Sequence, residues 1–169
     1  MSIVSPSSAH KFVGRVCIGL GSDSAEAHLV ADQLVGANLA GHDSHGIGML
    51  PSYVAGAVSG HLKVNQFPKI TTDAGSLVVF DGQSGFGQVN GYEAMKEGIE
   101  RARQFGVAIV GLRNSYHIGR IGHWAEQCAQ AKMVSVHFVN VIGHTPLVAP
   151  HGGAESRFGT NPFCAAVPG

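Results

Sequence analysis

Charged residues are scarce in this sequence, and their charges cancel. Asp, Glu, Lys and Arg make up 13% of the 169 residues, with 11 acidic and 11 basic side chains. Without an excess of positive charge there is no electrostatic reason to expect binding to nucleic acid or to an acidic membrane. A hydrophobic fraction of 44% beside so few charges indicates a globular chain with a sizeable core.

Cysteine and long apolar runs are also scarce. Cys17, Cys128 and Cys164 form no Cys-x-x-Cys pair, and the first two fall in helical patterns, which favours buried thiols over disulfides or metal-bound thiolates. No apolar run reaches the ~18 residues of a membrane-spanning helix. The first residues show no basic stretch followed by an apolar one, so a cytoplasmic location without a signal peptide is expected.

Hydrophobic periodicity predicts a mixed α/β (α+β) fold. Residues 1–60 read as a helical N-terminal segment, with helices near 8–20, 23–40 and 51–59. Ser7 or Ser8 can cap the first helix, and Asp23-x-x-Glu26 resembles a capping box at the start of the second. Residues 61–169 read as an α/β domain, and its expected elements follow the order hairpin 69–81, helix 88–105, strand 107–112, helix 121–131, strand 134–141 and strand 163–167. The last strand begins just before the chain stops, which predicts a segment of a longer protein.

Glycine is abundant, with 24 residues, and it gathers around histidines. The segment Gly41–Gly46 contains His42 and His45, separated by Asp43 and Ser44. One interpretation is a helix-ending turn whose polar groups satisfy the backbone. A metal site is disfavoured, because the flanking glycines indicate a loop and no further ligand stands nearby. The functional interpretation is that Ser44 orients the His45 ring for proton transfer to a substrate oxygen.

A second histidine, His117, lies between strand 107–112 and helix 121–131. The backbone N–H groups of Gly119, Arg120 and Ile121 would point from the start of that helix, a favourable position for a phosphate or carboxylate. Gly119-x-x-Gly122 lacks the preceding glycine of a dinucleotide fingerprint, so a Rossmann fold is excluded. The alternative is a packing imidazole beside a solvated arginine.

Two further polar positions follow in the C-terminal part. Asn140 stands at the end of strand 134–141, where its amide offers both a donor and an acceptor to a cleft. Gly159-Thr160-Asn161-Pro162 forms a tight polar turn before the last strand, and on local evidence alone a plain turn is the simpler interpretation.

These segments, in this order, resemble the malate/L-lactate dehydrogenase family of the second type. The family's serine–histidine–glycine loop matches Ser44-His45-Gly46, and its Leu-Pro-x-Tyr continuation matches residues 50–53. Its asparagine–serine–x–histidine–x–glycine loop matches residues 114–119, and its Gly-Thr-Asn-Pro turn matches residues 159–162. The resemblance covers essentially the whole chain.

The resemblance implies a non-Rossmann, mixed-sheet domain that binds NAD or NADP. The implied activity is hydride transfer between this cofactor and a 2-hydroxy acid/2-oxo acid pair, with cyclic imino-acid reduction in the same family as the alternative. Members are about twice as long as this chain, and an aspartate-bearing motif would lie beyond Gly169. Without this motif, little activity is expected for the isolated segment. The full-length form is expected to be a homodimer. A non-catalytic, histidine-rich module that binds a metal or a partner stays open as a different class.

The resemblance also assigns roles to residues. Ser44, His45 and His117 are the implied catalytic residues, and either histidine could be the principal acid or base. Implied substrate contacts are Met49, Arg120 and Asn114. Implied cofactor contacts are His45, Gly119, Arg120, Ile121, Asn140, Thr160, Asn161 and Pro162, and no metal is implied.

Met49 is a departure, because most members place a carboxylate-binding arginine at this position. Together with His-Ile-Gly-Arg-Ile-Gly it is similar to the hydroxycarboxylate dehydrogenase B branch, whose substrates include aryl pyruvates. We expect Arg120 to replace the lost arginine, as a carboxylate clamp or a cofactor-phosphate contact. A methionine beside the pocket would suit a bulky apolar substrate tail.

Overall fold

The computed structural model describes residues 4–143 and 145–169. The chain divides into two compact units, Met1–Arg120 and Ile121–Gly169. The division expected from composition, between residues 60 and 61, separates the helical start from the first strand and stays a prediction. Among the described residues, no helix is both long and apolar enough to cross a membrane.

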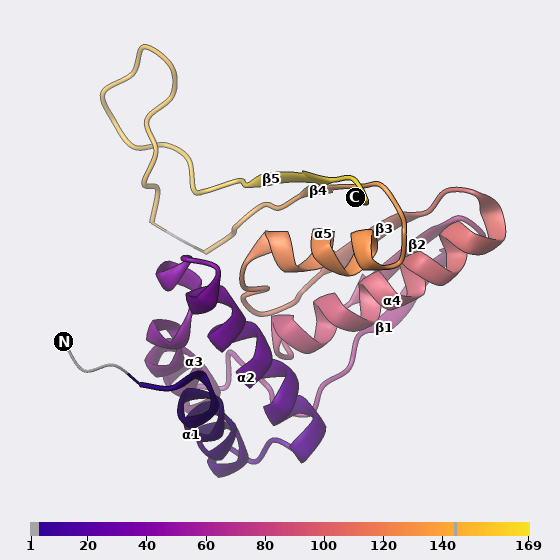
Figure 1. Cartoon of the computed structure of the whole chain (residues 1–169). Helices are drawn as coiled ribbons and strands as arrows, with labels where there is room; N and C mark the ends of the chain where they lie inside the picture. The colour runs from indigo at the N-terminus through magenta and orange to yellow at the C-terminus, as the bar shows by residue number, and fades with distance from the viewer. Residues whose placement is uncertain (1–3, 144) are drawn as a thin grey trace. The chain divides into compact units, whose positions relative to one another are not determined.

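The first unit begins with three helices, α1 (Pro6–Gly19), α2 (Ser24–Leu39) and α3 (Leu50–Val58) (Figure 1). Ser5, rather than Ser7 or Ser8, caps α1, because Pro6 occupies the first helical position, where its missing N–H needs no partner. The Asp23 side chain accepts a hydrogen bond from the Glu26 N–H at 2.8 Å, so the predicted cap of α2 is confirmed. The helices share a core of fully buried side chains, which includes Val13, Cys17, Val30, Leu34 and Tyr53.

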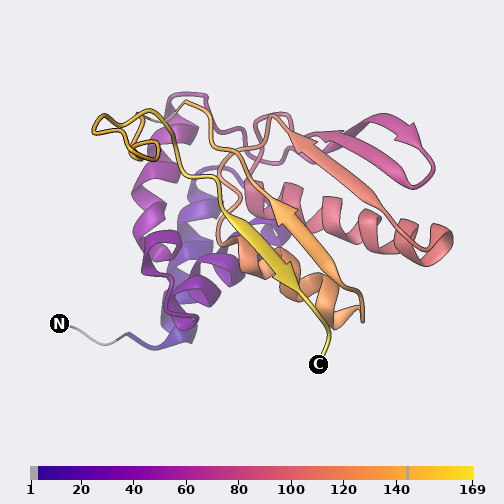
Figure 2. The same ribbon diagram turned by 90° about the horizontal axis from the view of Figure 1, so that it is seen from above.

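A β-α-β arrangement completes this unit. Strands β1 (Lys69–Ala74) and β2 (Leu77–Asp81) form the predicted antiparallel hairpin. Helix α4 (Gly87–Phe105) then leads to β3 (Ile109–Arg113), which pairs in parallel with β2. One face of this sheet packs on α4 through Val78, Phe80 and Ala94 (Figures 1 and 2). Gly106, with φ 82°, ends α4 in the left-handed conformation that glycine tolerates.

The second unit contains α5 (Ile121–Gln130), β4 (Ser135–Phe138) and β5 (Phe163–Ala166). The two strands pair antiparallel, and α5 packs along them (Figures 1 and 2). Strand β4 is shorter than the expected 134–141. Cys17 and Cys128 are both buried free thiols, as predicted, and burial raises the pKa of Cys17 to about 11. The mixed α/β fold class expected from the sequence is confirmed.

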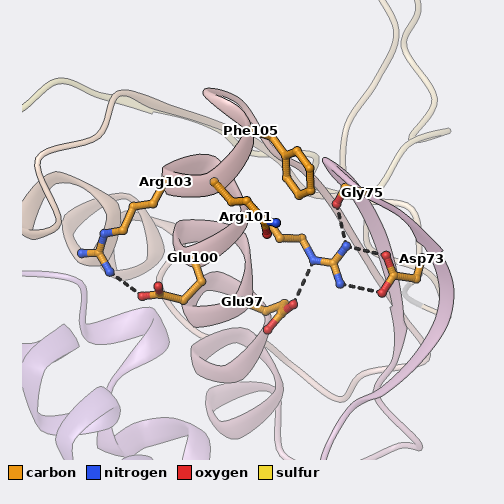
Figure 3. A pocket seen from close by; sticks show the side chains of 8 residues that line it. Asp73, Gly75, Glu97, Glu100, Arg101, Arg103 and Phe105 are labelled. Carbon is orange, nitrogen blue, oxygen red and sulfur yellow. Dashed lines mark hydrogen bonds and ion pairs between the residues drawn. The ribbon is translucent and has the colours of Figure 1, made fainter.

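A buried arginine fastens α4 to the β1–β2 turn at the edge of a hollow of about 560 Å³ (Figure 3). The Arg101 guanidinium donates to both Asp73 oxygens, at 2.6 and 2.8 Å, and to the Gly75 carbonyl at 2.6 Å. Its Nε donates to Glu97 at 2.9 Å. Because the protein's own groups already bind the guanidinium, we interpret this hollow as a structural contact between α4 and the hairpin.

Replacing Arg101 should therefore destabilise the fold in a pH-dependent way. The Arg101 hydrogen bonds hold the pKa of Asp73 below its usual value of 3.8, so the pair stabilises the folded state above that pH and loses this effect as the pH falls through the lowered pKa. We expect Arg101→Met to lower the Tm by several degrees at pH 7. The deficit relative to wild type should shrink below about pH 4.

Arg103→Met is the matched control, because Arg103 pairs with Glu100 on the exposed face of the same helix. Surface pairs of this kind contribute little to stability. Equal Tm values for the two variants at pH 7 would contradict the structural role of Arg101.

Candidate functional site

Parallel pairing of β2 and β3 brings two loops together. Asp81 and Arg113 are paired at the carboxyl ends of the two strands, so the segments that follow them leave from the same edge of the sheet. The Ser84 N–H donates to the Asn114 carbonyl at 2.7 Å, and the Tyr116 N–H donates to the Gly85 carbonyl at 3.0 Å. The second histidine loop is therefore joined to the loop before α4 by backbone hydrogen bonds.

Both polar atoms of the Asn114 amide form hydrogen bonds with other side chains of the protein. Its Nδ2 donates to Asp81 at 2.9 Å, and its Oδ1 accepts from the Ser84 hydroxyl at 3.2 Å. The residue has a left-handed backbone, with φ 51°, which asparagine adopts more readily than most side chains. These contacts make Asn114 a residue that shapes the loop; the substrate contact expected for it stays a prediction.

The first histidine loop is set by the end of α2. Gly41, with φ 75°, turns the chain, and the N–H groups of Gly41 and His42 donate to the carbonyls of Asn38 and Ala37 in a Schellman motif. Two short 3₁₀ turns follow, Asp43–His45 and Ile47–Met49, in place of irregular loop.

Asn38 holds these turns from both sides. Its Nδ2 donates to Asp43 at 2.5 Å, and its Oδ1 accepts from the Ile47 N–H at 2.8 Å. A Cβ on Gly46 would overlap the Asn38 amide, so only glycine allows this approach. The Ser44 hydroxyl lies 2.9 Å from His45 Nδ1, in agreement with the expected orientation of His45 by Ser44.

A buried hydrogen-bond chain supports His117. Gln88, near the start of α4, and Tyr53, in α3, are fully buried. Gln88 Nε2 donates to the Tyr53 hydroxyl at 2.7 Å, and this hydroxyl lies 2.8 Å from His117 Nδ1. A buried hydroxyl proton needs an acceptor, and Nδ1 is placed to be that acceptor, so we assign the donation in this contact to Tyr53. The neutral His117 ring then carries its proton on Nε2.

The two histidine loops meet at their imidazoles. The rings of His45 and His117 stack with centroids 5.3 Å apart and an interplanar angle of 29°. Burial, followed by the nearby His42, lowers the pKa of His45 below its usual 6.5, so the neutral ring is favoured near neutral pH. Charging both stacked rings would place like charges in contact, so the pair favours at most one added proton. Such a pair is suited to exchange a proton with a bound molecule.

Close packing against the start of α4 fixes the position of the backbone at His117. A Cβ on Gly87 would overlap the carbonyl groups of Tyr116 and His117. The glycine at the start of α4 therefore allows the second histidine loop to lie directly on the helix.

The other predicted residues of the first unit follow the two histidines closely in the sequence. Met49 is half-buried and packs against the helical core. Gly119 is buried with φ 71°, and Arg120 is partly exposed at the end of the unit. Helix α5 starts at Ile121, as the sequence predicts, but Ile121 belongs to the second unit.

The predicted cofactor residues of the second unit gather at one end of its sheet. The Val139 N–H donates to the Pro162 carbonyl at 3.1 Å, which continues the pairing in which Phe138 faces Phe163. Asn140 and the turn Thr160–Pro162 thus flank the same end of the β4–β5 ladder, and Asn140, Thr160 and Asn161 are exposed.

The sequence patterns did not indicate Asn38 and Gln88 as supporting residues, and Tyr53 stood out only as part of a motif. The sequence does contain a signal for Gln88. It stands four residues before Tyr92, so this polar side chain lies on the same face of α4 as the apolar ones. A polar residue in a buried stripe predicts a hydrogen-bond partner, although not which one.

Comparison with known proteins gives consistent findings. A family model described as malate/L-lactate dehydrogenase matches residues 4–169. Hydroxycarboxylate dehydrogenase B of Escherichia coli is 58% identical over 94% of this chain, which covers 44% of that protein. The structure of a malate dehydrogenase from Pyrococcus horikoshii is 39% identical with a TM-score of 0.91, over 98% of this chain and 47% of that one.

A structure of Δ1-piperideine-2-carboxylate reductase from Pseudomonas syringae is also similar. It is 28% identical with a TM-score of 0.86, over 99% of this chain and 50% of that one. The chain thus spans about half the length of the relatives that it matches.

The role of the Tyr53 hydroxyl in supporting His117 can be tested by substitution. Tyr53→Phe leaves the Gln88 N–H buried without an acceptor and removes the donor to His117 Nδ1. We expect a loss of about 1–3 kcal/mol in the free energy of unfolding, measured with urea. We also expect a mixture of His117 tautomers in ¹⁵N NMR spectra.

Tyr116→Phe is the control, because within the described residues the Tyr116 hydroxyl makes one long hydrogen bond, 3.3 Å to the Ser52 carbonyl. An unchanged His117 tautomer and wild-type stability in Tyr53→Phe would show that the hydroxyl does not support the ring.

Proposed function

Because the chain belongs to the malate/L-lactate dehydrogenase family, we propose that its protein is an NAD- or NADP-dependent oxidoreductase of 2-hydroxy and 2-oxo acids. The observation that carries this proposal is the stacked pair His45–His117, which joins the two histidine loops in one site. Oxidation of a 2-hydroxy acid releases a hydride from C2 and a proton from the hydroxyl group. The hydride goes to the nicotinamide, and a side chain must take the proton.

We assign the proton transfer to this histidine pair, with His45 as its first candidate. Its lowered pKa keeps the ring neutral near neutral pH, as a proton acceptor requires. Ser44 holds Nδ1, so Nε2 is the ring nitrogen that would meet the substrate hydroxyl. For reduction of a 2-oxo acid the same ring must first be protonated and then donates to the carbonyl oxygen. His117 is the alternative principal base; to accept a proton at Nε2 its ring must carry the other proton on Nδ1, so that this nitrogen donates to the Tyr53 hydroxyl, the reverse of the resting assignment.

We further propose that the chain contributes part of the site for a dinucleotide cofactor, which would supply the hydride acceptor. Gly119 has a left-handed backbone that a side chain would strain, and it leads directly into the N-terminus of α5. The N–H groups of Gly119, Arg120 and Ile121 would hold a phosphate there, with Arg120 adding positive charge. For the second unit, taken by itself, we propose the exposed polar groups of Asn140, Thr160 and Asn161 as candidate cofactor contacts.

The substrate proposal rests on Met49. It packs against the apolar core where most family members are expected to carry an arginine, so a carboxylate clamp must come from another residue. We propose Arg120 for this role, or for the cofactor phosphate, and a substrate with an aryl or bulky apolar tail beside Met49.

Cyclic imino-acid reduction is the second candidate, supported by the similarity to the piperideine-carboxylate reductase. Both reactions need a hydride donor and one protonated side chain. An assay of a cyclic imine against phenylpyruvate separates the two, since only the preferred substrate should saturate the enzyme at low concentration.

Substitution of the histidines tests the assignment of the base. In a catalytically active form of the protein, His45→Gln should lower kcat by about 10²–10⁴-fold, since a general acid or base contributes this much, with little change in cofactor affinity. His61→Gln is the control, because His61 is exposed and bonds Ser59 away from the pair. Unchanged turnover in His45→Gln with a large loss in His117→Gln would transfer the role to His117. Unchanged turnover in both would overturn the proposal.

Cofactor binding can be followed through Trp124, the single tryptophan of the sequence, which lies in the first turn of α5. We expect saturable quenching of its emission by NADH or NADPH. Arg120→Gln should weaken the binding, because a positive charge beside the phosphate is lost. Titrations of Trp124→Phe, followed by nicotinamide fluorescence, correct for inner-filter effects. Absence of saturable quenching with both nucleotides would contradict the cofactor proposal.

A further inference from the structure

A second cluster of histidines lies on α1 and α2, built from different residues than the stacked pair. His10 Nε2 lies 2.8 Å from one oxygen of Asp32, and His28 Nε2 lies 3.2 Å from the other. The two rings meet edge to face with centroids 4.9 Å apart. Within residues 4–143 and 145–169, these three side chains are the group whose potential ligand atoms all lie within 4.8 Å of one another.

The spacing of these atoms is suitable for a metal ion. Two ligands about 2.1 Å from zinc at a tetrahedral angle stand about 3.4 Å apart, close to the separations seen here. Two imidazole nitrogens and one carboxylate are ligands that zinc and its neighbours in the first transition row prefer over calcium or magnesium. With neutral rings the three groups carry one negative charge, which opposes that of a divalent cation.

The scaffold holds the cluster in place. His28 and Asp32 are one helical turn apart on α2, on the same face. His10 projects from α1, which packs on α2 through the buried side chains of Val13 and Val30. The side chains of His28 and Asp32 are 65% and 48% exposed, so ions in solution can reach them. A metal would need little rearrangement of the backbone.

We propose that His10, His28 and Asp32 bind a divalent transition-metal ion of the zinc type, which links α1 to α2. Binding replaces the ring protons that now face the Asp32 oxygens, so metal and protons compete for the same nitrogens. The site draws on none of the residues assigned to hydride or proton transfer, and the inference does not depend on the proposed oxidoreductase activity.

Calorimetric titration of EDTA-treated protein with zinc chloride at pH 7.5 tests this site. We expect one zinc ion per chain with a dissociation constant in the micromolar range. In His28→Gln the affinity should fall by at least about tenfold, because one of the three ligands is lost. The affinity of the wild-type protein should also fall as the pH is lowered, because zinc and protons compete for the same ring nitrogens. Zinc should raise the Tm of the wild-type protein and not that of His28→Gln, whereas magnesium should raise neither.

Two controls separate this site from other histidines. His61→Gln should bind zinc as wild type does, and so should the double variant His45→Gln/His117→Gln. Asp32→Asn, which leaves both rings in place, should weaken binding as His28→Gln does, and circular dichroism verifies that each variant is folded. Wild-type zinc binding in both His28→Gln and Asp32→Asn, or no zinc binding by the wild-type protein, would overturn the proposal.

Discussion

The buried chain of hydrogen bonds from Gln88 through Tyr53 to His117 is the constraint on which the candidate site depends. It joins α4, α3 and the second histidine loop, three elements that local sequence does not connect. Because a buried donor or acceptor without a partner is costly, each member of the chain fixes the position of the next. The Tyr53 hydroxyl is the central group of this chain, since it accepts a hydrogen bond from Gln88 and donates one to His117.

Close backbone approaches complete the site. Glycine at positions 46 and 87 leaves room for the Asn38 amide and for the carbonyl of His117, respectively. As a result, one loop is fastened to the end of α2 and the other lies on the start of α4. The stacking of His45 on His117 follows from these two attachments. Gly46 and Gly87 are therefore required for a steric reason, which is the space needed for backbone and amide groups at the site.

The histidines of this chain occupy two kinds of environment, and the difference explains their proposed roles. His45 and His117 are bound through Nδ1 to hydroxyl groups, and the pKa of His45 is lowered by burial. His10 and His28 instead face the Asp32 carboxylate through Nε2 on an exposed surface. A hydroxyl partner leaves a ring uncharged and suited to proton exchange, whereas a carboxylate partner adds the negative charge that a metal ion requires.

Local patterns in the sequence determined the element order, the capping of α2 by Asp23, the β1–β2 hairpin and the start of α5. They also determined the segments that carry the family resemblance. The reason is that periodicity, caps and turns act over a few residues. They did not determine the cap of α1, the length of β4 or the partners of Gln88. Only the tertiary structure decided that His45 stacks on His117, that Tyr53 donates to a histidine, and that His10 joins His28 and Asp32. These contacts connect residues far apart in the sequence, and their geometry depends on how helices and strands pack, which no local pattern encodes.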